Sequence, residues 1–157
     1  MILFGGSGLG KTRTLFEVLS REASGGGSIE PIRWIRGIDF QTEVIERTKP
    51  NGSGGIVEWR ESLVEAFLLA FDDLDKARFT PRVEVELFNL IDRRTNERRP
   101  IIITSNSSSD ALLAKLSPDT GPAIVRRIRE FCHPINFDPR VDSKEQIKSP
   151  PRYGVKK

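Results

Sequence analysis

Short apolar runs alternate with longer stretches of mixed polarity along the chain. Uninterrupted apolar runs that stop at glycine, proline or acidic residues are typical of buried strands. They predict strands over residues 2–4, 67–71 and 101–104. The alternation of apolar and polar residues predicts a strand over 32–40, and a last strand is expected over 134–137. Apolar positions that recur every three or four residues predict amphipathic helices. These cover residues 12–23, 39–48, 58–65, 81–98, 110–116 and 121–131.

Strands that alternate with helices favour an α/β fold with a central parallel sheet. The runs at 2–4, 67–71 and 101–103 are apolar throughout, as expected where helices cover both faces of a sheet. Glycine-rich and serine-rich segments at 24–28 and 49–55 predict loops. We therefore expect one domain over residues 1–138, followed by a basic, proline-containing tail over 139–157 that is extended or disordered.

Composition is that of a globular chain: 157 residues, of which 37% are hydrophobic and 30% charged. No apolar run approaches the roughly 20 residues that span a bilayer, and no basic leader precedes the first apolar run. One cysteine, Cys132, and one histidine, His133, exclude an internal disulfide and a Cys/His metal cluster. These observations predict a cytoplasmic protein with no membrane partner.

Charge is distributed unevenly. Residues 81–157 carry 15 basic and 10 acidic side chains, a balance that suits a polyanion such as nucleic acid. The net charge of the whole chain is only +3, so an ordinary solvated surface is the simpler explanation on charge alone.

The segment after the first predicted strand matches the phosphate-binding pattern G-x-x-x-x-G-K-[ST] at every fixed position. Its glycines let backbone N–H groups wrap a phosphate, Lys11 can reach the β- and γ-phosphates, and the Thr12 hydroxyl can ligate Mg²⁺. We therefore expect ATP or ADP and Mg²⁺ as cofactors. The alternative is a glycine-rich turn without a ligand. The expected nucleotide-binding residues are Gly5, Gly6, Ser7, Gly8, Leu9, Gly10, Lys11, Thr12 and Arg13.

Two carboxylates, Asp72 and Asp73, follow the apolar run at 68–71. In P-loop NTPases the first carboxylate after such a strand holds the Mg²⁺ shell, which assigns Asp72 to the metal together with Thr12. A second carboxylate can activate the attacking water, and Asp73 is the candidate base. Many ATPases place Glu there, and the shorter Asp predicts slower hydrolysis. A strand that simply ends at a helix-starting Asp is the alternative.

Four segments together resemble those of an AAA+ ATPase. They are GGSGLGKT (5–12), LLAFDDLD (68–75), IIITSN (101–106) and VRRIREF (125–131). The resemblance is strongest to the DnaC/IstB-like group of helicase loaders and transposition helper ATPases. It implies a three-layer α/β/α P-loop NTPase fold. It also implies an oligomeric ATPase that binds DNA, with single-stranded DNA as the expected form, and loads or remodels a replicative helicase or a transposase.

The same resemblance gives roles to further residues. Asn106 is identified as the polar sensor between Asp73 and the γ-phosphate, although an amide in a turn would look the same. Arg127, with Arg126 as the alternative, is identified as the arginine finger that enters a neighbouring subunit of a homo-oligomer. A solvated basic helix face is the competing interpretation. The expected catalytic residues are therefore Lys11, Asp73, Asn106 and Arg127.

The chain departs from that group at its ends. We expect the segment that contacts adenine and a full helical lid to be missing, as in a fragment of a longer protein. A weakly hydrolysing nucleotide switch and a small P-loop kinase are the alternative functions. Candidate DNA contacts are Lys49, Arg93, Arg94, Arg98, Arg99, Lys144, Lys148, Lys156 and Lys157, with Trp34, Trp59 and Tyr153 as stacking candidates; Trp34 is rather expected in the core.

Overall fold

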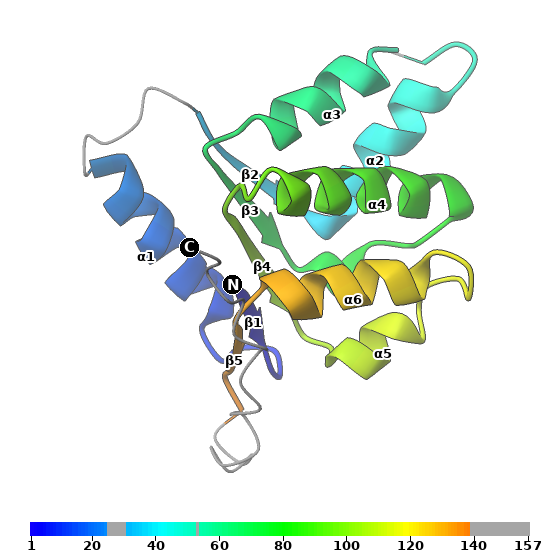
Figure 1. The fold of residues 1–157 in the computed structure, drawn as a ribbon. Coiled ribbons are helices and arrows are strands. Elements are labelled where there is room, and N and C mark those ends of the chain that lie inside the picture. Colours follow the sequence, from blue (N-terminus) through cyan, green and yellow to red (C-terminus); the bar gives the residue numbers. More distant parts are fainter. Residues whose placement is uncertain (25–30, 53, 139–157) are drawn as a thin grey trace, which may run out of the picture.

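The computed structural model describes residues 1–24, 31–52 and 54–138. A five-stranded sheet with the strand order β2-β3-β4-β1-β5 forms its centre (Figure 1), and every pair of neighbouring strands is parallel. The strands are β1 (Ile2–Phe4), β2 (Ile32–Arg36), β3 (Leu68–Asp72), β4 (Ile101–Ser105) and β5 (Pro134–Asn136). The predicted α/β fold with a central parallel sheet is confirmed.

Helices cover the two faces of the sheet unequally. Within the described residues one face carries only α1 (Lys11–Ser24), whereas all later helices lie on the opposite face (Figure 1). This arrangement gives the three expected layers, helix, sheet and helix. The later helices are α2 (Gly37–Thr48), α3 (Ile56–Val64), α4 (Pro81–Asn96), α5 (Ser109–Leu113) and α6 (Gly121–Phe131), with a 3₁₀ turn η1 (Leu74–Lys76) after β3.

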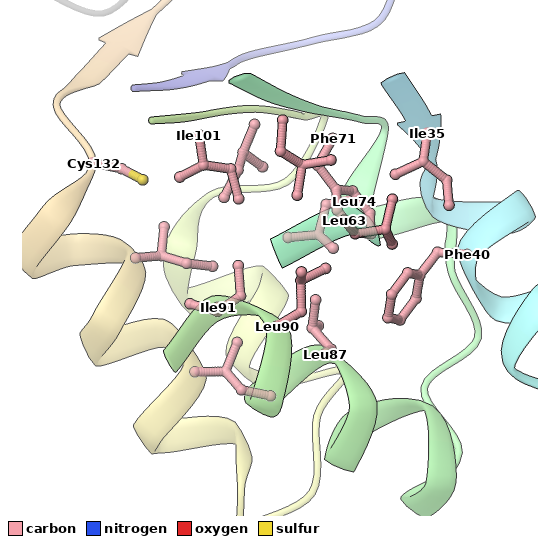
Figure 2. Close-up of a cluster of buried hydrophobic side chains, with 14 of the residues drawn as sticks. Ile35, Phe40, Leu63, Phe71, Leu74, Leu87, Leu90, Ile91, Ile101 and Cys132 are labelled. Carbon is pink, nitrogen blue, oxygen red and sulfur yellow. The ribbon is translucent and has the colours of Figure 1, made fainter. Parts of the chain in front are cut away.

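The larger core lies between the sheet and α2, α4 and α6. Phe71 of β3 contacts Phe40 of α2, with ring centroids 5.2 Å apart, and Leu87, Leu90 and Ile91 of α4 pack beside them (Figure 2). A smaller core under α1 consists of Leu15, Leu19, Leu68, Ala70 and Ile102. Strands β3 and β4 are buried at every position, as their apolar residues predict, and the polar residues that end them are buried as well.

The boundary between β2 and α2 differs from the one predicted from the sequence. The strand predicted over 32–40 ends at Arg36, because α2 begins at Gly37. A Cβ atom on Gly37 would lie 2.5 Å from the backbone oxygen of Asp73, so glycine lets α2 start directly against the segment that follows β3. The start of α2 therefore packs against the end of β3.

The expectation that Trp34 lies in the core is wrong. This side chain is 42% exposed, and its ring contacts Phe16 of α1 at a centroid distance of 5.5 Å. Strand β2 is at the sheet edge, and α1 is the one described helix on that face, so no second described helix covers the indole.

The predicted tail at 139–157 lies outside the described residues, as do residues 25–28 of the predicted glycine-rich loop. Candidate DNA contacts Lys144, Lys148, Tyr153, Lys156 and Lys157 are in that tail. Within the described part of the chain, no helix combines the length and the apolar character needed to cross a membrane.

Arg94 is not an exposed DNA contact, which corrects the expectation for this arginine. Its side chain is fully buried, and its guanidinium donates to the backbone oxygens of Leu63 (2.7 Å), Val64 (2.9 Å), Ala66 (2.9 Å) and Pro100. Burial, and secondarily repulsion from Arg99, lower the pKa of Arg94 to about 10. The group stays charged near neutrality and fixes the carboxyl end of α3 against α4 and the start of β4.

We predict that Arg94→Met lowers the free energy of unfolding by about 3 kcal/mol, because three buried carbonyl oxygens lose this donor and the Pro100 oxygen loses one of its two. Urea unfolding followed by circular dichroism measures the change. Arg93→Met is the matched control, since Arg93 is 40% exposed and pairs with Glu61 and Glu97 at the surface. The control should cost less than about 1 kcal/mol, and equal losses in the two variants would contradict a special role for Arg94.

Candidate active site at the carboxyl end of the sheet

Sheet topology brings three chain segments together. Strand β4 lies between β1 and β3, with Phe4 opposite Ser105 and Phe71 opposite Ile103. All three strands run in the same direction, so the glycine-rich loop after β1 meets the residues at the ends of β3 and β4. Polar groups far apart in the sequence thereby gather at one edge of the sheet.

The glycine-rich loop has a backbone that other residues adopt only with strain. Gly5, Gly8 and Gly10 have φ angles of 138°, 79° and 90°. At Gly5 a Cβ atom would also approach the backbone nitrogen of Asp138 to 3.1 Å. The loop leads directly into α1, whose amino-terminal N–H groups and dipole favour an anion at this place.

Lys11, the first residue of α1, is 5% exposed and places its ammonium group under the loop. Its Nζ atom donates to the backbone oxygens of Gly5 and Gly6, at 2.8 Å each, and to Oδ1 of Asn106 at 2.7 Å. These are the three donors that a lysine has, and each meets an uncharged oxygen. The positive charge of Lys11 is therefore held in place without being neutralised.

Thr12 and Asp72 are in direct contact. The Thr12 hydroxyl donates to Oδ1 of Asp72 at 3.0 Å, and Thr104 of β4 donates to the same oxygen at 2.5 Å. The Asp72 carboxylate is nearly buried. The motifs predicted Thr12 and Asp72 as a pair but gave no role to Thr104, which lies in the run IIITSN. The Thr104 hydroxyl also accepts a hydrogen bond from the backbone N–H of Asp73 (2.7 Å).

Asp73 adopts the left-handed conformation, with φ 48°, which turns the chain out of β3 and into η1. Its Oδ1 accepts a hydrogen bond from Nδ2 of Asn106 at 3.3 Å. Because Oδ1 of Asn106 accepts from Lys11, the Asn106 amide bridges Lys11 and Asp73. The structure thus brings together Lys11, Thr12, Asp72, Asp73 and Asn106.

A cavity of about 310 Å³ opens above these residues. Lys76 of η1 is a lining residue that the sequence analysis missed, because it belongs to no motif and its approach depends on the turn after Asp73. Gly5, Gly6 and Asp72 do not line the cavity but hold Lys11 and Thr12 beneath it. The lining residues are Ser7, Gly8, Leu9, Gly10, Lys11, Thr12, Arg13, Asp73, Lys76 and Asn106.

The residues present suit a magnesium ion shared with a ligand. The Thr12 hydroxyl and the Asp72 carboxylate offer hard oxygen donors side by side. Among residues 1–24, 31–52 and 54–138 no group of three or more His, Cys, Asp or Glu side chains could hold a metal ion. Mg²⁺ commonly takes one or two protein ligands and completes its shell with phosphates and water, which fits this pair.

The two candidate finger arginines lie outside this group of residues, on α6. Arg127 is 24% exposed and forms an ion pair with Asp92 of α4, with Nη2 and Oδ1 2.6 Å apart. Arg126 is 64% exposed, and its Nε atom lies 4.0 Å from Glu130. Neither side chain lines the cavity of its own chain.

The strand order, the glycine-rich loop at the amino end of α1 and the polar residues that end β3 and β4 define an AAA+ P-loop ATPase core. The chain belongs to the bacterial DnaA ATPase domain family, whose sequence model matches residues 1–117. No curated protein matches the chain at a significant level.

Solved structures confirm the fold. AMPPCP-bound DnaA from Aquifex aeolicus superimposes with a TM-score of 0.69 at 20% identity, over 87% of this chain and 39% of that one. A replication initiator DnaA bound to AMPPCP and single-stranded DNA gives 0.74 at 22% identity, over 92% and 41%. The DnaC helicase loader gives 0.71 at 19% identity, over 88% and 77%. The chain thus spans about two fifths of the DnaA structures.

Proposed function

We propose that this chain binds ATP with Mg²⁺ in the 310 Å³ cavity and hydrolyses it. The observation that carries the proposal is the Lys11 ammonium, fixed beneath a glycine-rich loop by three uncharged oxygens with its charge uncompensated. A site built in this way attracts an anion of high charge. The phosphate chain of ATP fits the loop, the helix terminus and the cation together.

The surrounding residues supply the parts that hydrolysis requires. Thr12 and Asp72 would hold the metal, and when bound the ion would neutralise charge on the phosphate oxygens. Asp73 would orient the attacking water and accept its proton. Asn106, which already contacts Asp73 and Lys11, would keep the base and the cation at a fixed separation. Lys76 adds a second lysine to the cavity wall.

The AAA+ family supports an assembly in which one subunit completes the site of the next. We assign the finger to Arg127, with Arg126 as the alternative. Arg126 is mostly exposed and has only a 4.0 Å contact with Glu130 to give up before it reaches a neighbouring subunit. Arg127 must first break its ion pair with Asp92. The Arg127 ion pair is only partly exposed, so a phosphate from a neighbouring subunit has to compete with a nearby carboxylate.

DNA is the polymer partner that we propose, because a structural relative is bound to single-stranded DNA. The described residues contribute one exposed aromatic surface on the α1 face of the sheet, formed by Phe16 and Trp34. The Arg36 guanidinium lies 6.0 Å from the centre of the Trp34 ring. Stacking on the indole together with an arginine suits a single strand with unpaired bases.

We further propose that nucleotide-dependent assembly on DNA serves to load or remodel a replication or transposition protein. The fold relationship to a helicase loader supports this role.

We predict that Lys11→Ala abolishes ATP binding, because it removes the cation beneath the loop. Asp73→Asn should retain binding within about threefold while phosphate release falls by at least about 100-fold, as expected when a general base is lost. Titration calorimetry with ATP and Mg²⁺ measures binding, and a coupled phosphate assay measures turnover. Unchanged nucleotide affinity in Lys11→Ala would refute the proposal. Tight binding without any phosphate release by the unmodified chain would instead identify a nucleotide switch.

The finger is tested by mixing subunits. We predict that Arg127→Ala binds ATP normally but lowers turnover about 1,000-fold, since an arginine finger contributes roughly that much. Mixing it with Lys11→Ala should restore part of the activity, because the second variant still provides an intact finger. Arg126→Ala is the matched control on the same helix, and the opposite pattern would move the finger to Arg126. Full activity in both single variants would exclude both arginines as the finger.

Trp34→Ala should weaken binding of a fluorescently labelled oligothymidine about tenfold at fixed salt, as expected for the loss of one stacking platform. Trp34→Phe should recover part of that affinity. Phe131→Ala is the control. Phe131 is equally exposed at 42%, but it is the last residue of α6 and does not belong to the Phe16–Trp34 surface. Equal losses for Trp34→Ala and Phe131→Ala, or no loss for either, would exclude this surface as the DNA contact.

A further inference from the structure

Asp75 is a nearly buried carboxylate two residues beyond the proposed base, in the 3₁₀ turn η1, and only 6% of it is exposed. The function proposed above gives it no role, and in the sequence it looks like an ordinary loop or capping residue. In the structure its side chain turns toward the end of β4 rather than toward solvent. There it accepts hydrogen bonds from two consecutive residues, Asn106 and Ser107.

These contacts fix the backbone at one position. The N–H of Asn106 donates to Oδ1 of Asp75 at 2.8 Å, and the Ser107 hydroxyl donates to Oδ2 at 3.2 Å. Strand β4 ends at Ser105, so Asn106 is the first residue beyond the sheet ladder. Asp75 therefore supplies, from η1, the hydrogen bond that a neighbouring strand would supply inside the sheet.

A lysine just after α5 completes the arrangement. Nζ of Lys115, which follows α5, donates to the backbone oxygen of Asp75 at 3.0 Å and lies 3.7 Å from its Oδ2. It also lies 3.4 Å from the Ser107 hydroxyl. The Asp75 carboxylate is thus paired with a cation and hydrogen-bonded on both oxygens, as a buried charge must be.

The position of Asn106 matters because both polar atoms of its side-chain amide make hydrogen bonds within the site. Oδ1 accepts from Lys11 at 2.7 Å, and Nδ2 donates to Asp73 at 3.3 Å. A shift of the Asn106 backbone would break one or both of these contacts. Misplacement of a reacting group by about 1 Å can lower a rate by about 100-fold, so the anchor of Asn106 bears on turnover.

We propose that Asp75 is a positioning residue that holds Asn106 between Lys11 and Asp73, with Lys115 as its counter-ion. The proposal rests on the function proposed above, since it assigns a role within the same site. Asp75 itself does not line the cavity. Its effect passes through the Asn106 backbone to the geometry in which Asp73 meets water.

The test compares kcat with nucleotide affinity. Asp75→Ala should lower kcat by about 10-fold to 100-fold, while the dissociation constants for ATP and ADP stay within about threefold. Asp75→Asn should recover most of kcat, because its amide oxygen can still accept from the Asn106 N–H. Lys115→Met, which removes the counter-ion but keeps the acceptor, should lower kcat only a few-fold. Asp119→Ala, an exposed carboxylate in the loop before α6, is the control and should leave kcat unchanged.

A second readout does not depend on turnover. Hydrogen exchange at the Asn106 backbone amide, followed by NMR, should be at least about tenfold faster in Asp75→Ala than in the unmodified chain and in Asp119→Ala. If the unmodified chain neither binds nor hydrolyses ATP, the proposed function fails, and the exchange measurement still decides whether Asp75 anchors Asn106. Unchanged exchange at Asn106 overturns the inference, as does a kcat for Asp75→Ala equal to that of the unmodified chain. A parallel loss of kcat and nucleotide affinity would show general damage to the site and would also overturn it.

Discussion

The site depends on the position of β4 between β1 and β3. This strand aligns Phe4 with Ser105 on one side and Phe71 with Ile103 on the other, so all three strands end at the same edge of the sheet. Lys11, the Asp72–Asp73 pair and Asn106 therefore lie close together at that edge. Buried strand residues on each side of β4 supply the rigidity, and the polar groups add specificity.

Charge is arranged so that the cation and the carboxylates remain apart. The hydrogen bonds of the Lys11 ammonium go only to uncharged oxygens, and the Asn106 amide links Lys11 to the Asp73 carboxylate. Asp72 is occupied by two threonine hydroxyls instead of by the lysine. A direct Lys11–Asp73 ion pair would neutralise the charge that attracts phosphate. The bridging amide keeps that attraction while it fixes the distance between the two groups.

The motifs predicted Lys11, Thr12, Asp72 and Asp73 from the sequence, because each motif has a fixed place relative to a strand end, and the AAA+ resemblance added Asn106. The strand Leu68–Asp72 and the loop at Gly5–Gly10 illustrate this: local sequence sets both their conformation and their chemistry. Asp75, Lys76 and Thr104 could not be assigned in this way. Their roles depend on the left-handed turn at Asp73 and on contacts between segments about 30 residues apart, and no local pattern encodes either.

The errors at Trp34 and Arg94 have a common physical origin. Residue type indicates how favourable burial is, but which surfaces are covered is decided by the packing of whole helices. The α1 face of the sheet has one described helix, so an apolar indole on edge strand β2 stays exposed beside Phe16. The opposite face has several helices, and the carboxyl end of α3 leaves backbone oxygens that need a donor. Arg94 is buried because it satisfies those oxygens, whereas its neighbour Arg93, one position along the same helix, stays at the surface.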